Sequence, residues 1–379
     1  MSVVDGLIAG MPLSGSPLAV GLVIVAGLLG VRAVRRRIHG SGHAGERLLI
    51  LGESRLGRQI VEEIGRRPQL RTVIAGVVAD ARNVGRIIDT TRPDRIVVAL
   101  AERRGRLPLY PLLESRARGI LVEDAAETYE RLTGRLALEA LSPSSVIFSR
   151  RFQASRLHRV ASRVLGLVAA LVGLILLAPV LGLIVLLIKL DSRGPALFVQ
   201  ERIGLCGRPF RLLKFRTMRP VSRPTSEWER DNCDRITRVG NWLRRFRLDE
   251  LPQLVNVLRG DMNLVGPRPH PTTNLALITL AARNLSQVSG DAIPYYSLRC
   301  SVRPGITGWA QVRYGYANSL EEEMEKICYD LYYLKHMSLW LDLRILAETA
   351  GMLLTGRGGA SAADRRGQRA VAERLGHAA

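Results

Sequence analysis

The chain has 379 residues, of which 47% are hydrophobic and 23% charged, a composition that excludes an intrinsically disordered or fibrous protein and leaves room for two folded domains. Its 55 basic and 34 acidic residues give a formal net charge of +21, which favours an anionic partner such as nucleic acid, acidic lipid or a phosphorylated substrate. The four cysteines show neither C-x-x-C spacing nor a neighbouring histidine pattern, so no zinc site and no disulfide framework is predicted.

An uncharged segment lies near the start of the chain. Residues 6–31 contain no charged side chain, and four arginines follow at Arg32, Arg35, Arg36 and Arg37. A cleaved signal peptide would carry positive charge before its apolar segment, whereas here the arginines come after it. The positive-inside rule places such a cluster in the cytoplasm. We therefore predict a transmembrane anchor over residues 1–44, with the N-terminus outside and the remaining chain on the cytoplasmic side.

Residues 45–142 alternate between apolar runs typical of strands and patterns typical of helices, which predicts an α/β domain with a parallel sheet. The first run enters a loop with Gly52, Ser54 and Gly57, which resembles a dinucleotide-binding loop whose middle glycine is replaced by serine. Asp80 follows the second run and is placed to hold a ribose. We predict a Rossmann-like domain of the nucleotide-binding type, and two roles stay open: nucleotide binding, or a structural or regulatory role without a ligand.

A second uncharged stretch runs from Val164 to Ile188 and is long enough, at about 1.5 Å per residue, to cross a bilayer core of about 30 Å. Basic residues flank it on both sides, and Pro179 lies past its middle, where proline disrupts a helix. Both observations fit a re-entrant helix over residues 160–190 that is broken at Pro179 and returns to the cytoplasmic face. An ordinary span with a proline kink is the alternative.

The densest motif block lies in residues 155–379, the predicted second domain, which we expect to be mostly α-helical. Apolar side chains at i, i+3, i+4 and i+7 predict a short amphipathic helix with Asp249 and Glu250 at its start. An aspartate, with a reference pKa of about 3.9, is ionised at neutral pH and attacks phosphorus if cations neutralise the phosphate. The adjacent Glu250 is suited to Mg²⁺, which prefers oxygen ligands. Helix capping is the simpler explanation of an isolated Asp-Glu pair.

Basic and glycine-rich motifs on both sides of this pair favour the chemical interpretation. Lysine and arginine neutralise a diphosphate and its leaving group, and glycine-proline turns let the backbone approach a ligand. Arg202 and Arg303 belong to two of these motifs and are candidate phosphate-binding residues. The full set is Gln200–Gly204, Lys214–Met218, Arg259, Gly266–Pro269 and Arg303–Gln311.

In this order the motifs resemble the polyprenyl-phosphate glycosyl-1-phosphate transferases, bacterial sugar transferases that initiate exopolysaccharide, capsule and O-antigen synthesis. The resemblance covers about residues 155–356 and rests on KFRTM, RLDELPQLVNVLRGDMNLVGPRP, RPGITGWAQV and YDLYYLKHMSLWLDLRIL. RYGYANS and YDLYYLKH are similar to the wording of members associated with exosortase-type clusters. Larger members commonly have four N-terminal spans, whereas this chain shows one.

The resemblance implies that Asp249 attacks the β-phosphate of a UDP-sugar and releases UMP, and that undecaprenyl phosphate then takes the phosphosugar from the aspartate. Glu250 is implied to bind Mg²⁺. The resemblance also implies an enzyme of the bacterial inner membrane whose catalytic domain faces the cytoplasm. The identity of the sugar and the formation of a homo-oligomer stay open. Residues implied to lie near phosphates or the active site are Lys214, Arg216, Arg259, Arg268 and Asp330.

One departure from the family pattern concerns the start of the membrane helix, where members often have Lys-Arg-x-x-Asp. The corresponding residues here are His158, Arg159 and Ser162, so an expected ion pair is missing and the anchoring of the helix start is in question.

Two other functions compete with the transferase. A basic adaptor for nucleic acid or lipid fits the charge, but aromatics are only 5% and no nucleic-acid fold signature is present, so no nucleic-acid partner is expected. An NAD-dependent sugar-nucleotide enzyme lacks the intact glycine loop and a Tyr-x-x-x-Lys pair.

Overall fold

The structure is a computed structural model. It describes residues 45–68, 71–79, 83–102, 105–138, 141, 148–149, 152, 154–219, 234–272, 294–314 and 320–355. The predicted anchor over residues 1–44 and the candidate ribose-binding residue Asp80 lie outside the described residues.

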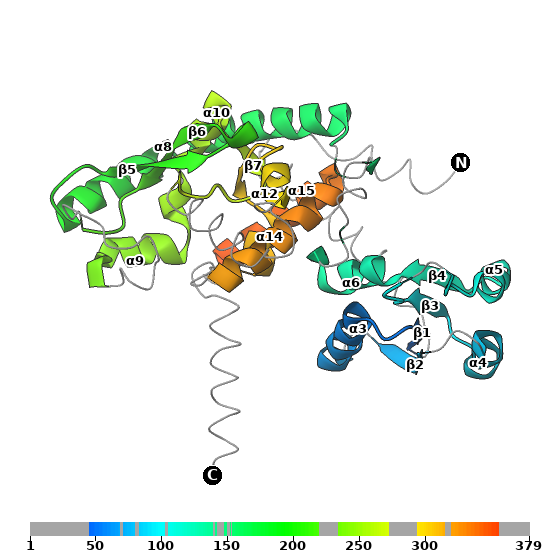
Figure 1. The fold of residues 1–379 in the computed structure, drawn as a ribbon. Coiled ribbons are helices and arrows are strands. Elements are labelled where there is room, and N and C mark those ends of the chain that lie inside the picture. The colour runs from blue at the N-terminus through cyan, green and yellow to red at the C-terminus, as the bar shows by residue number, and fades with distance from the viewer. Residues whose placement is uncertain are drawn as a thin grey trace, which may run out of the picture. The chain divides into compact units, whose positions relative to one another are not determined.

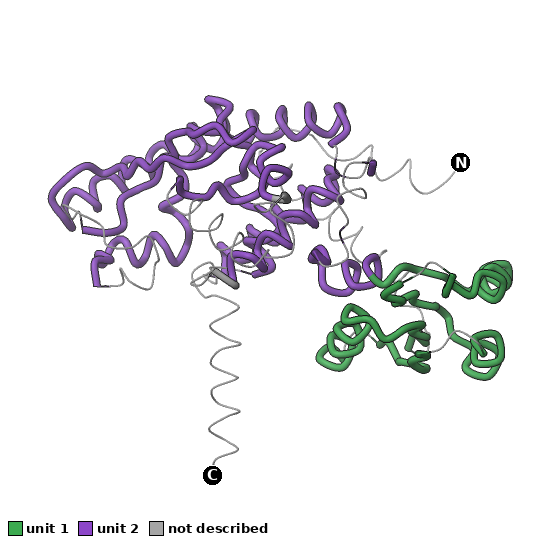
Figure 2. Tube along the Cα trace, in the orientation of Figure 1, with its two compact units in different colours: residues 1–125 green, residues 126–379 purple. Residues whose placement is uncertain are grey.

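The chain divides into two compact units, residues 1–125 and residues 126–379 (Figure 2). Helix α6 (Ala125–Thr133) follows the last strand of unit 1 directly, and almost all of it belongs to unit 2. Lys335 donates hydrogen bonds of 2.8 Å to both carboxylate oxygens of Glu130, which holds α6 against the later part of the chain. The two units divide between residues 125 and 126, and the domain bounds of residues 45–142 stay a prediction.

Unit 1 contains a parallel sheet, as the sequence predicted. Its strands are β1 (Glu46–Leu51), β2 (Thr72–Val78), β3 (Arg95–Val98) and β4 (Leu121–Asp124), and their spatial order is β2-β1-β3-β4. This order corresponds to that of flavodoxin-type doubly wound sheets, whereas dinucleotide-binding sheets begin 3-2-1. The more specific Rossmann-like assignment is therefore not confirmed.

Helices cover both faces of this sheet, which explains why the inner strand β1 is apolar and buried over residues 48–51. Helix α3 (Arg55–Arg66) lies on one side, and α4 (Val84–Thr91) and α5 (Leu109–Ala117) lie on the other (Figure 1). Leu49 and Leu51 of β1 share a buried cluster with side chains of α4 and α5. Their neighbours Leu48 and Ile50 alternate to the opposite face and are also buried.

The uncharged stretch of residues 164–188 lies within the long helix α8 (Arg156–Asp191) of unit 2. Among the described residues, α8 is the helix that is long and apolar enough to cross a membrane, with a mean hydropathy of 3.1 in its most apolar window. The predicted break at Pro179 is corrected by the structure, because the helix continues through this residue. Proline removes one backbone hydrogen bond, and the turns on either side maintain the helix. The re-entrant path over residues 160–190 stays a prediction.

The start of α8 is held by a buried acid from a distant segment. His158 Nε2 lies 3.0 Å from Asp342 Oδ2, and Tyr333 donates a hydrogen bond of 2.8 Å to Asp342 Oδ1. Asp342 belongs to α15 (Leu339–Leu354), and Tyr333 belongs to α14 (Leu320–Lys335). The acid that the sequence lacks at Ser162 is therefore supplied by α15.

The other elements of unit 2 pack around α8 and α14 (Figure 1). Strands β5 (Leu197–Ile203) and β6 (Pro209–Phe215) form an antiparallel hairpin, and the short strands β7 (Asn263–Val265) and β8 (Gly305–Thr307) pair in parallel. The main core contains side chains of α12, α13, α14 and α15. The remaining elements are η5 (Leu205–Gly207), α9 (Arg238–Arg245), η7 (Leu248–Glu250), α10 (Gln253–Arg259), α12 (Pro294–Arg299) and α13 (Trp309–Arg313).

Replacing the histidine at the start of α8 tests this anchor. We expect His158→Ala to destabilise unit 2 by about 2–3 kcal/mol, because Asp342 is 2% exposed and loses one of its two partners. The measurement is thermal unfolding of the detergent-solubilised protein. Arg159→Ala, at an exposed position one residue away, is the matched control. Equal melting temperatures for the two variants would contradict the anchoring role.

Candidate active site

A tight turn places the Asp-Glu pair. Helix α9 ends at Arg245, and Arg247 adopts a left-handed conformation with φ 53°, which redirects the chain into the 3-10 turn η7. Asp249 and Glu250 lie in η7, immediately before α10. This confirms the predicted position at a helix start. An arginine in this backbone region is uncommon and marks a turn that the surrounding structure must hold in place.

The buried face of α10 differs in part from the predicted one. Leu254 is buried as expected, but Leu258 is exposed and Val257 is buried in its place. The reason is that α10 packs against both α8 and β6, so two adjoining sides of this short helix are covered. The periodic pattern assumed a single covered face.

Glu250 is the centre of a buried charge cluster. Lys214 Nζ lies 3.0 Å from Glu250 Oε1, and an Arg268 nitrogen lies 3.1 Å from the same oxygen. Burial alone would raise the pKa of Glu250, but the charges of Lys214 and Arg268 outweigh it and hold the pKa well below its usual range. Burial lowers the pKa of Lys214, and the Glu250 charge opposes this. Glu250 is therefore an ionised side chain whose charge is balanced from two other segments.

Asp249 lies beside this cluster in a different environment. Its side chain is half-buried, whereas Glu250 is 4% exposed. Burial raises the pKa of Asp249, the Lys214 charge opposes the shift, and the negative charge of Glu250 adds to it. The two adjacent carboxylates thus differ: Glu250 is locked in ion pairs, and Asp249 is the more basic and more accessible. Such a separation assigns different chemical roles to two acids in one site.

Arg202 is the third cation of the predicted set that lies near the pair. It donates hydrogen bonds to Gln200 Oε1 and to the carbonyl of Pro269, next to Arg268 in the chain. Its charge contributes to the lowered pKa of Lys214. Arg244 also acts on the site, because its charge opposes the rise in the pKa of Asp249. The sequence motifs did not single out Arg244, which lies outside the motif blocks, at the end of α9.

Three other predicted cations have different positions. Arg216 is buried and donates hydrogen bonds to the carbonyls of Arg193 and Ser192, at the end of α8. Arg303 Nε donates to the carbonyl of Gly260, at the end of α10. Arg259 is exposed in the last turn of α10. None of the three makes a described hydrogen bond to Asp249 or Glu250.

Asp330 is connected to the Glu250 cluster through Arg299. It is 2% exposed and accepts a hydrogen bond of 2.7 Å from Arg299 Nε, and a second Arg299 nitrogen donates to the carbonyl of Arg268. Arg299 therefore fixes the backbone that carries the Arg268 side chain toward Glu250. Sequence reasoning tied Asp330 to the site and missed Arg299, because nothing local in Pro294–Arg299 indicates a partner on α14.

Two glycine motifs meet in space although they are far apart in the chain. A Cβ atom at Gly266 would lie 2.5 Å from the carbonyl oxygen of Arg303, and one at Gly305 would lie 2.1 Å from the Gly266 nitrogen. Such distances leave room for hydrogen only, so the backbones of β7 and β8 touch. This contact places the Gly-Pro-Arg-Pro turn, and with it Arg268.

Asn256 is a further residue that sequence reasoning missed. It is fully buried on α10, its Oδ1 accepts a hydrogen bond of 3.0 Å from the Leu213 backbone, and its Nδ2 donates to the carbonyl of Arg211 at 2.7 Å. These bonds join α10, which follows Glu250, to β6, which carries Lys214. An amide within the apolar run Leu-Val-Asn-Val-Leu was the available signal, because a buried polar side chain needs a partner.

The predicted Mg²⁺ would need carboxylate oxygens at this site. Both cations contact Glu250 Oε1, and neither of these two bonds uses Oε2. No group of three His, Cys, Asp or Glu side chains suited to a metal occurs among the described residues. Mg²⁺ typically binds through one or two carboxylates together with substrate phosphates and water. The adjacent carboxylates of Asp249 and Glu250 therefore fit Mg²⁺ in the presence of a diphosphate substrate.

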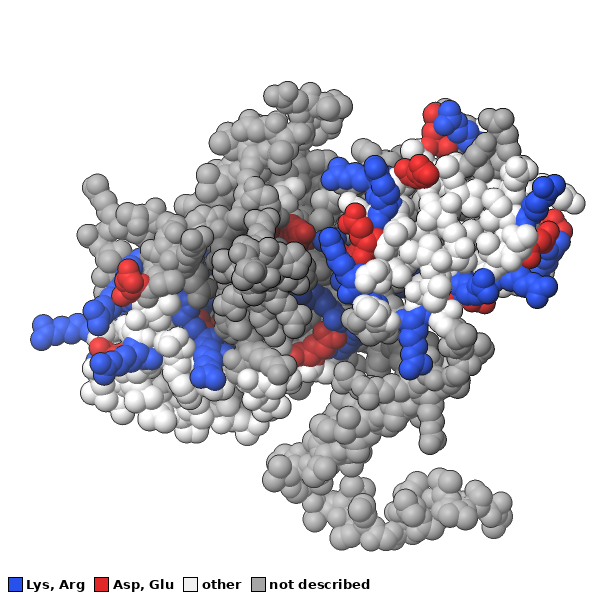
Figure 3. Space-filling model, turned by 90° about the horizontal axis from the view of Figure 1, so that it is seen from below, with Lys and Arg blue, Asp and Glu red and all other residues white. Residues whose placement is uncertain are grey.

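The positive charge of the described residues is dispersed on the face that Figure 3 shows. On the face shown in Figure 3, the lysine and arginine side chains of the described residues stand in separate groups with uncharged atoms between them. Proteins that follow a nucleic-acid backbone have a continuous basic groove. The described part of this face shows no such groove.

A family model for bacterial sugar transferases matches residues 157–356, which include every element of the site described above. The chain belongs to the bacterial sugar transferase family. This membership confirms the resemblance drawn from the motifs, and it favours a transferase over the basic adaptor and the NAD-dependent enzyme.

Curated relatives of this sugar transferase carry specific names. The UDP-glucose:undecaprenyl-phosphate glucose-1-phosphate transferase of Caulobacter vibrioides is 45% identical over 57% of this chain and 79% of that protein. The Escherichia coli protein of the same name is 30% identical over 86% of this chain and 71% of its own length. The UDP-N-acetylgalactosamine-undecaprenyl-phosphate N-acetylgalactosaminephosphotransferase of Aeromonas hydrophila is 40% identical over 60% of this chain, and the match spans about half, 51%, of that relative.

The amide that joins α10 to β6 can be tested directly. We expect Asn256→Ala to lower the free energy of unfolding by about 3 kcal/mol, because the Leu213 amide and the Arg211 carbonyl lose their partner. Thermal unfolding of the solubilised protein measures this effect. Arg259→Ala, on the exposed side of the same helix, is expected to unfold like the wild type. A wild-type melting temperature for Asn256→Ala would show that the amide does not hold the two elements together.

Proposed function

We propose that this sugar transferase moves a sugar-1-phosphate from a UDP-sugar to undecaprenyl phosphate through a covalent intermediate on Asp249. The observation that carries the proposal is the pair of unlike carboxylates: an accessible Asp249 beside a Glu250 that is ion-paired to Lys214 and Arg268. The names of the Caulobacter and Escherichia relatives support the substrate class.

In the first step a carboxylate oxygen of Asp249 attacks the β-phosphorus of the UDP-sugar. The bond between that phosphorus and the bridging oxygen breaks, and UMP leaves with the electron pair. In the second step an oxygen of undecaprenyl phosphate attacks the same phosphorus, and the bond to the aspartate breaks. The product is a diphosphate-linked lipid, and the Asp249 carboxylate is regenerated. Because both nucleophiles are anions, neither step needs a general base to remove a proton.

The cations of the cluster neutralise the substrate. A diphosphate that enters beside Asp249 meets Lys214 and Arg268, which already face a carboxylate, with Arg202 close by. Preorganised positive charge at the transferred phosphoryl group is the main protein contribution to phosphoryl transfer. Arg259 and Arg303, at the end of α10, are proposed to contact the phosphate of the lipid.

We also propose that Glu250 and Asp249 are the residues that would hold Mg²⁺. The ion would supply further neutralisation of the phosphates and of the departing UMP. Lys214 and Arg268 keep Glu250 ionised, and a metal ligand must be ionised.

The contacts of α8 support a site at the membrane surface. Arg216, two residues after Lys214 in the chain, binds the carbonyls of Ser192 and Arg193 at the end of α8. The apolar helix and the phosphate-binding strand are therefore held together. A cytoplasmic orientation at the bacterial inner membrane would bring a soluble UDP-sugar and a lipid phosphate to the same carboxylate.

The nucleophile assignment predicts that Asp249→Asn abolishes product formation. An amide cannot displace UMP, so the rate should fall at least about a thousandfold. The assay is UMP release from UDP-sugars by the solubilised protein, together with transfer of label from a sugar-labelled donor to the protein. Asp234→Asn, at an exposed position, serves as the control. Retained labelling of the Asp249→Asn protein would refute the covalent role.

The metal assignment predicts a loss of UMP release in EDTA and its recovery with added Mg²⁺. We expect Glu250→Gln to need roughly tenfold or more Mg²⁺ for half-maximal activity, because a neutral amide is a weaker ligand than a carboxylate. Glu201→Gln, at an exposed position on β5, should keep the wild-type requirement. Undiminished UMP release in EDTA would rule out the metal.

A further inference from the structure

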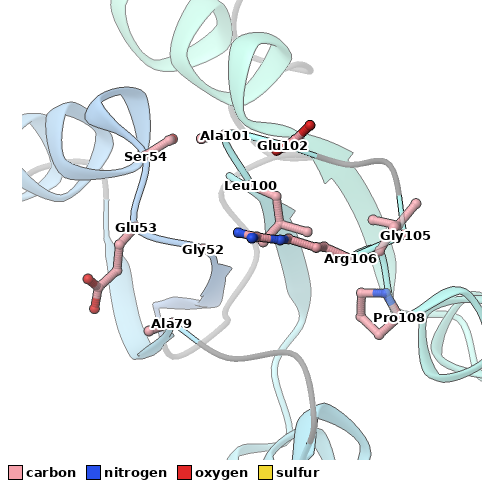
Figure 4. A pocket seen from close by; sticks show the side chains of 11 residues that line it. Gly52, Glu53, Ser54, Ala79, Leu100, Ala101, Glu102, Gly105, Arg106 and Pro108 are labelled. Carbon is pink, nitrogen blue, oxygen red and sulfur yellow. The ribbon is translucent and has the colours of Figure 1, made fainter.

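A cavity of about 870 Å³ lies at the carboxyl ends of the strands of unit 1. Its walls come from three loops that follow three parallel strands, and Figure 4 shows their side chains around the opening. The volume falls in the range of small-molecule sites and is far larger than a single phosphate ion needs. The residues that line it include Gly52, Ser54, Leu100, Ala101 and Arg106.

The topology of the sheet explains why a cavity forms here. The chain passes from β1 to β2 on one side, whereas β3 lies on the other side of β1. The loops that leave β1 and β3 therefore diverge. In doubly wound sheets, ligands bind in the crevice that this divergence opens at the carboxyl ends of the strands.

The floor of the cavity is backbone. Gly52 has φ +109°, and a Cβ atom at this position would lie 2.5 Å from the carbonyl oxygen of Ala99. The two loops therefore touch where they begin, at Gly52 after β1 and Ala99 after β3, and no side chain from Gly52 fills the space. A ligand can approach the main chain at this point.

Arg106 provides a cation without a partner. It has no hydrogen bond or ion pair to the part of the chain that the structure describes, and its side chain is exposed. Figure 4 shows it extending across the pocket toward Gly52, with the carboxylates of Glu53 and Glu102 pointing away from its guanidinium. An arginine in this position matches an anionic oxygen group of a ligand.

Ser54 decides between classes of nucleotide. Its Oγ accepts a hydrogen bond of 3.1 Å from the Gly57 backbone and so caps α3, which explains the serine in place of the middle glycine. A dinucleotide needs glycine there so that its pyrophosphate can approach the loop. The cation that this cavity offers to a phosphate is instead Arg106, on the loop that follows β3.

We propose that unit 1 binds a mononucleotide in this cavity, with its phosphate on Arg106 and its nucleoside over Gly52 and Leu100. A nucleotide combines an anionic end with a planar body, which matches the Arg106 cation and the uncharged Gly52 and Leu100. Glu53 and Glu102 also line the cavity, with their carboxylates directed away from the guanidinium of Arg106. The site is separate from Asp249 and does not depend on the transfer reaction.

The test uses the full-length solubilised protein and equilibrium dialysis with labelled AMP, ATP and UMP. NAD⁺ and inorganic phosphate are included as competitors, and the binding that is lost in the Arg106→Ala variant is distinguished in this way from binding at a donor site in unit 2. We expect saturable binding of at least one mononucleotide. Arg106→Ala should weaken it roughly tenfold or more, because a charged hydrogen bond is lost. Arg86→Ala, an exposed arginine of α4 outside the cavity, should leave it unchanged.

Ala101→Trp is a second variant that fills the opening and should abolish binding with Arg106 intact. Three results would overturn the proposal: no mononucleotide binding up to about 1 mM, equal binding by Arg106→Ala and the wild type, or tighter binding of NAD⁺ or phosphate than of any mononucleotide. Because Arg106 belongs to unit 1, these results are read independently of UMP release.

Discussion

The site depends on one buried carboxylate that must stay charged. Removing Glu250 from water costs several kcal/mol in free energy, which only close opposite charges offset. Lys214 and Arg268 supply them on the same oxygen, and they come from β6 and from the turn after β7. Three separate segments of the chain are therefore held to one point. Asp249 takes its position from that arrangement, and burial raises its pKa against the opposing charges of Lys214 and Arg268.

Polar contacts hold both ends of the apolar helix α8. At its end, α8 is bound by Arg216, and at its start His158 meets the buried Asp342. One side of α8 packs against neighbouring elements, where Ala170, Ile184 and Ile188 are buried, and many apolar side chains on its other side are exposed. Directional hydrogen bonds at its two ends add to this packing, and those of Arg216 connect α8 to the strand that carries Lys214.

Local sequence patterns were sufficient to predict two kinds of element. The alternation of apolar runs in unit 1 predicted a parallel sheet, and the uncharged stretch around Pro179 predicted an apolar helix. Two details were wrong for the same reason. The helix continues through Pro179, and Leu258 is exposed where burial was expected, because neighbouring turns or neighbouring elements outweigh the preference of a single residue.

The sequence by itself determined the family, the Asp249-Glu250 pair and the requirement for cations around it, because these are properties of residue type and order. Only the tertiary structure decided which cations take part. It brought Lys214 and Arg268 to Glu250, assigned Arg216 to the end of α8 and placed Arg299 behind Arg268. The physical reason is that an ion pair forms between atoms about 3 Å apart in space, and separation along the chain does not specify that distance.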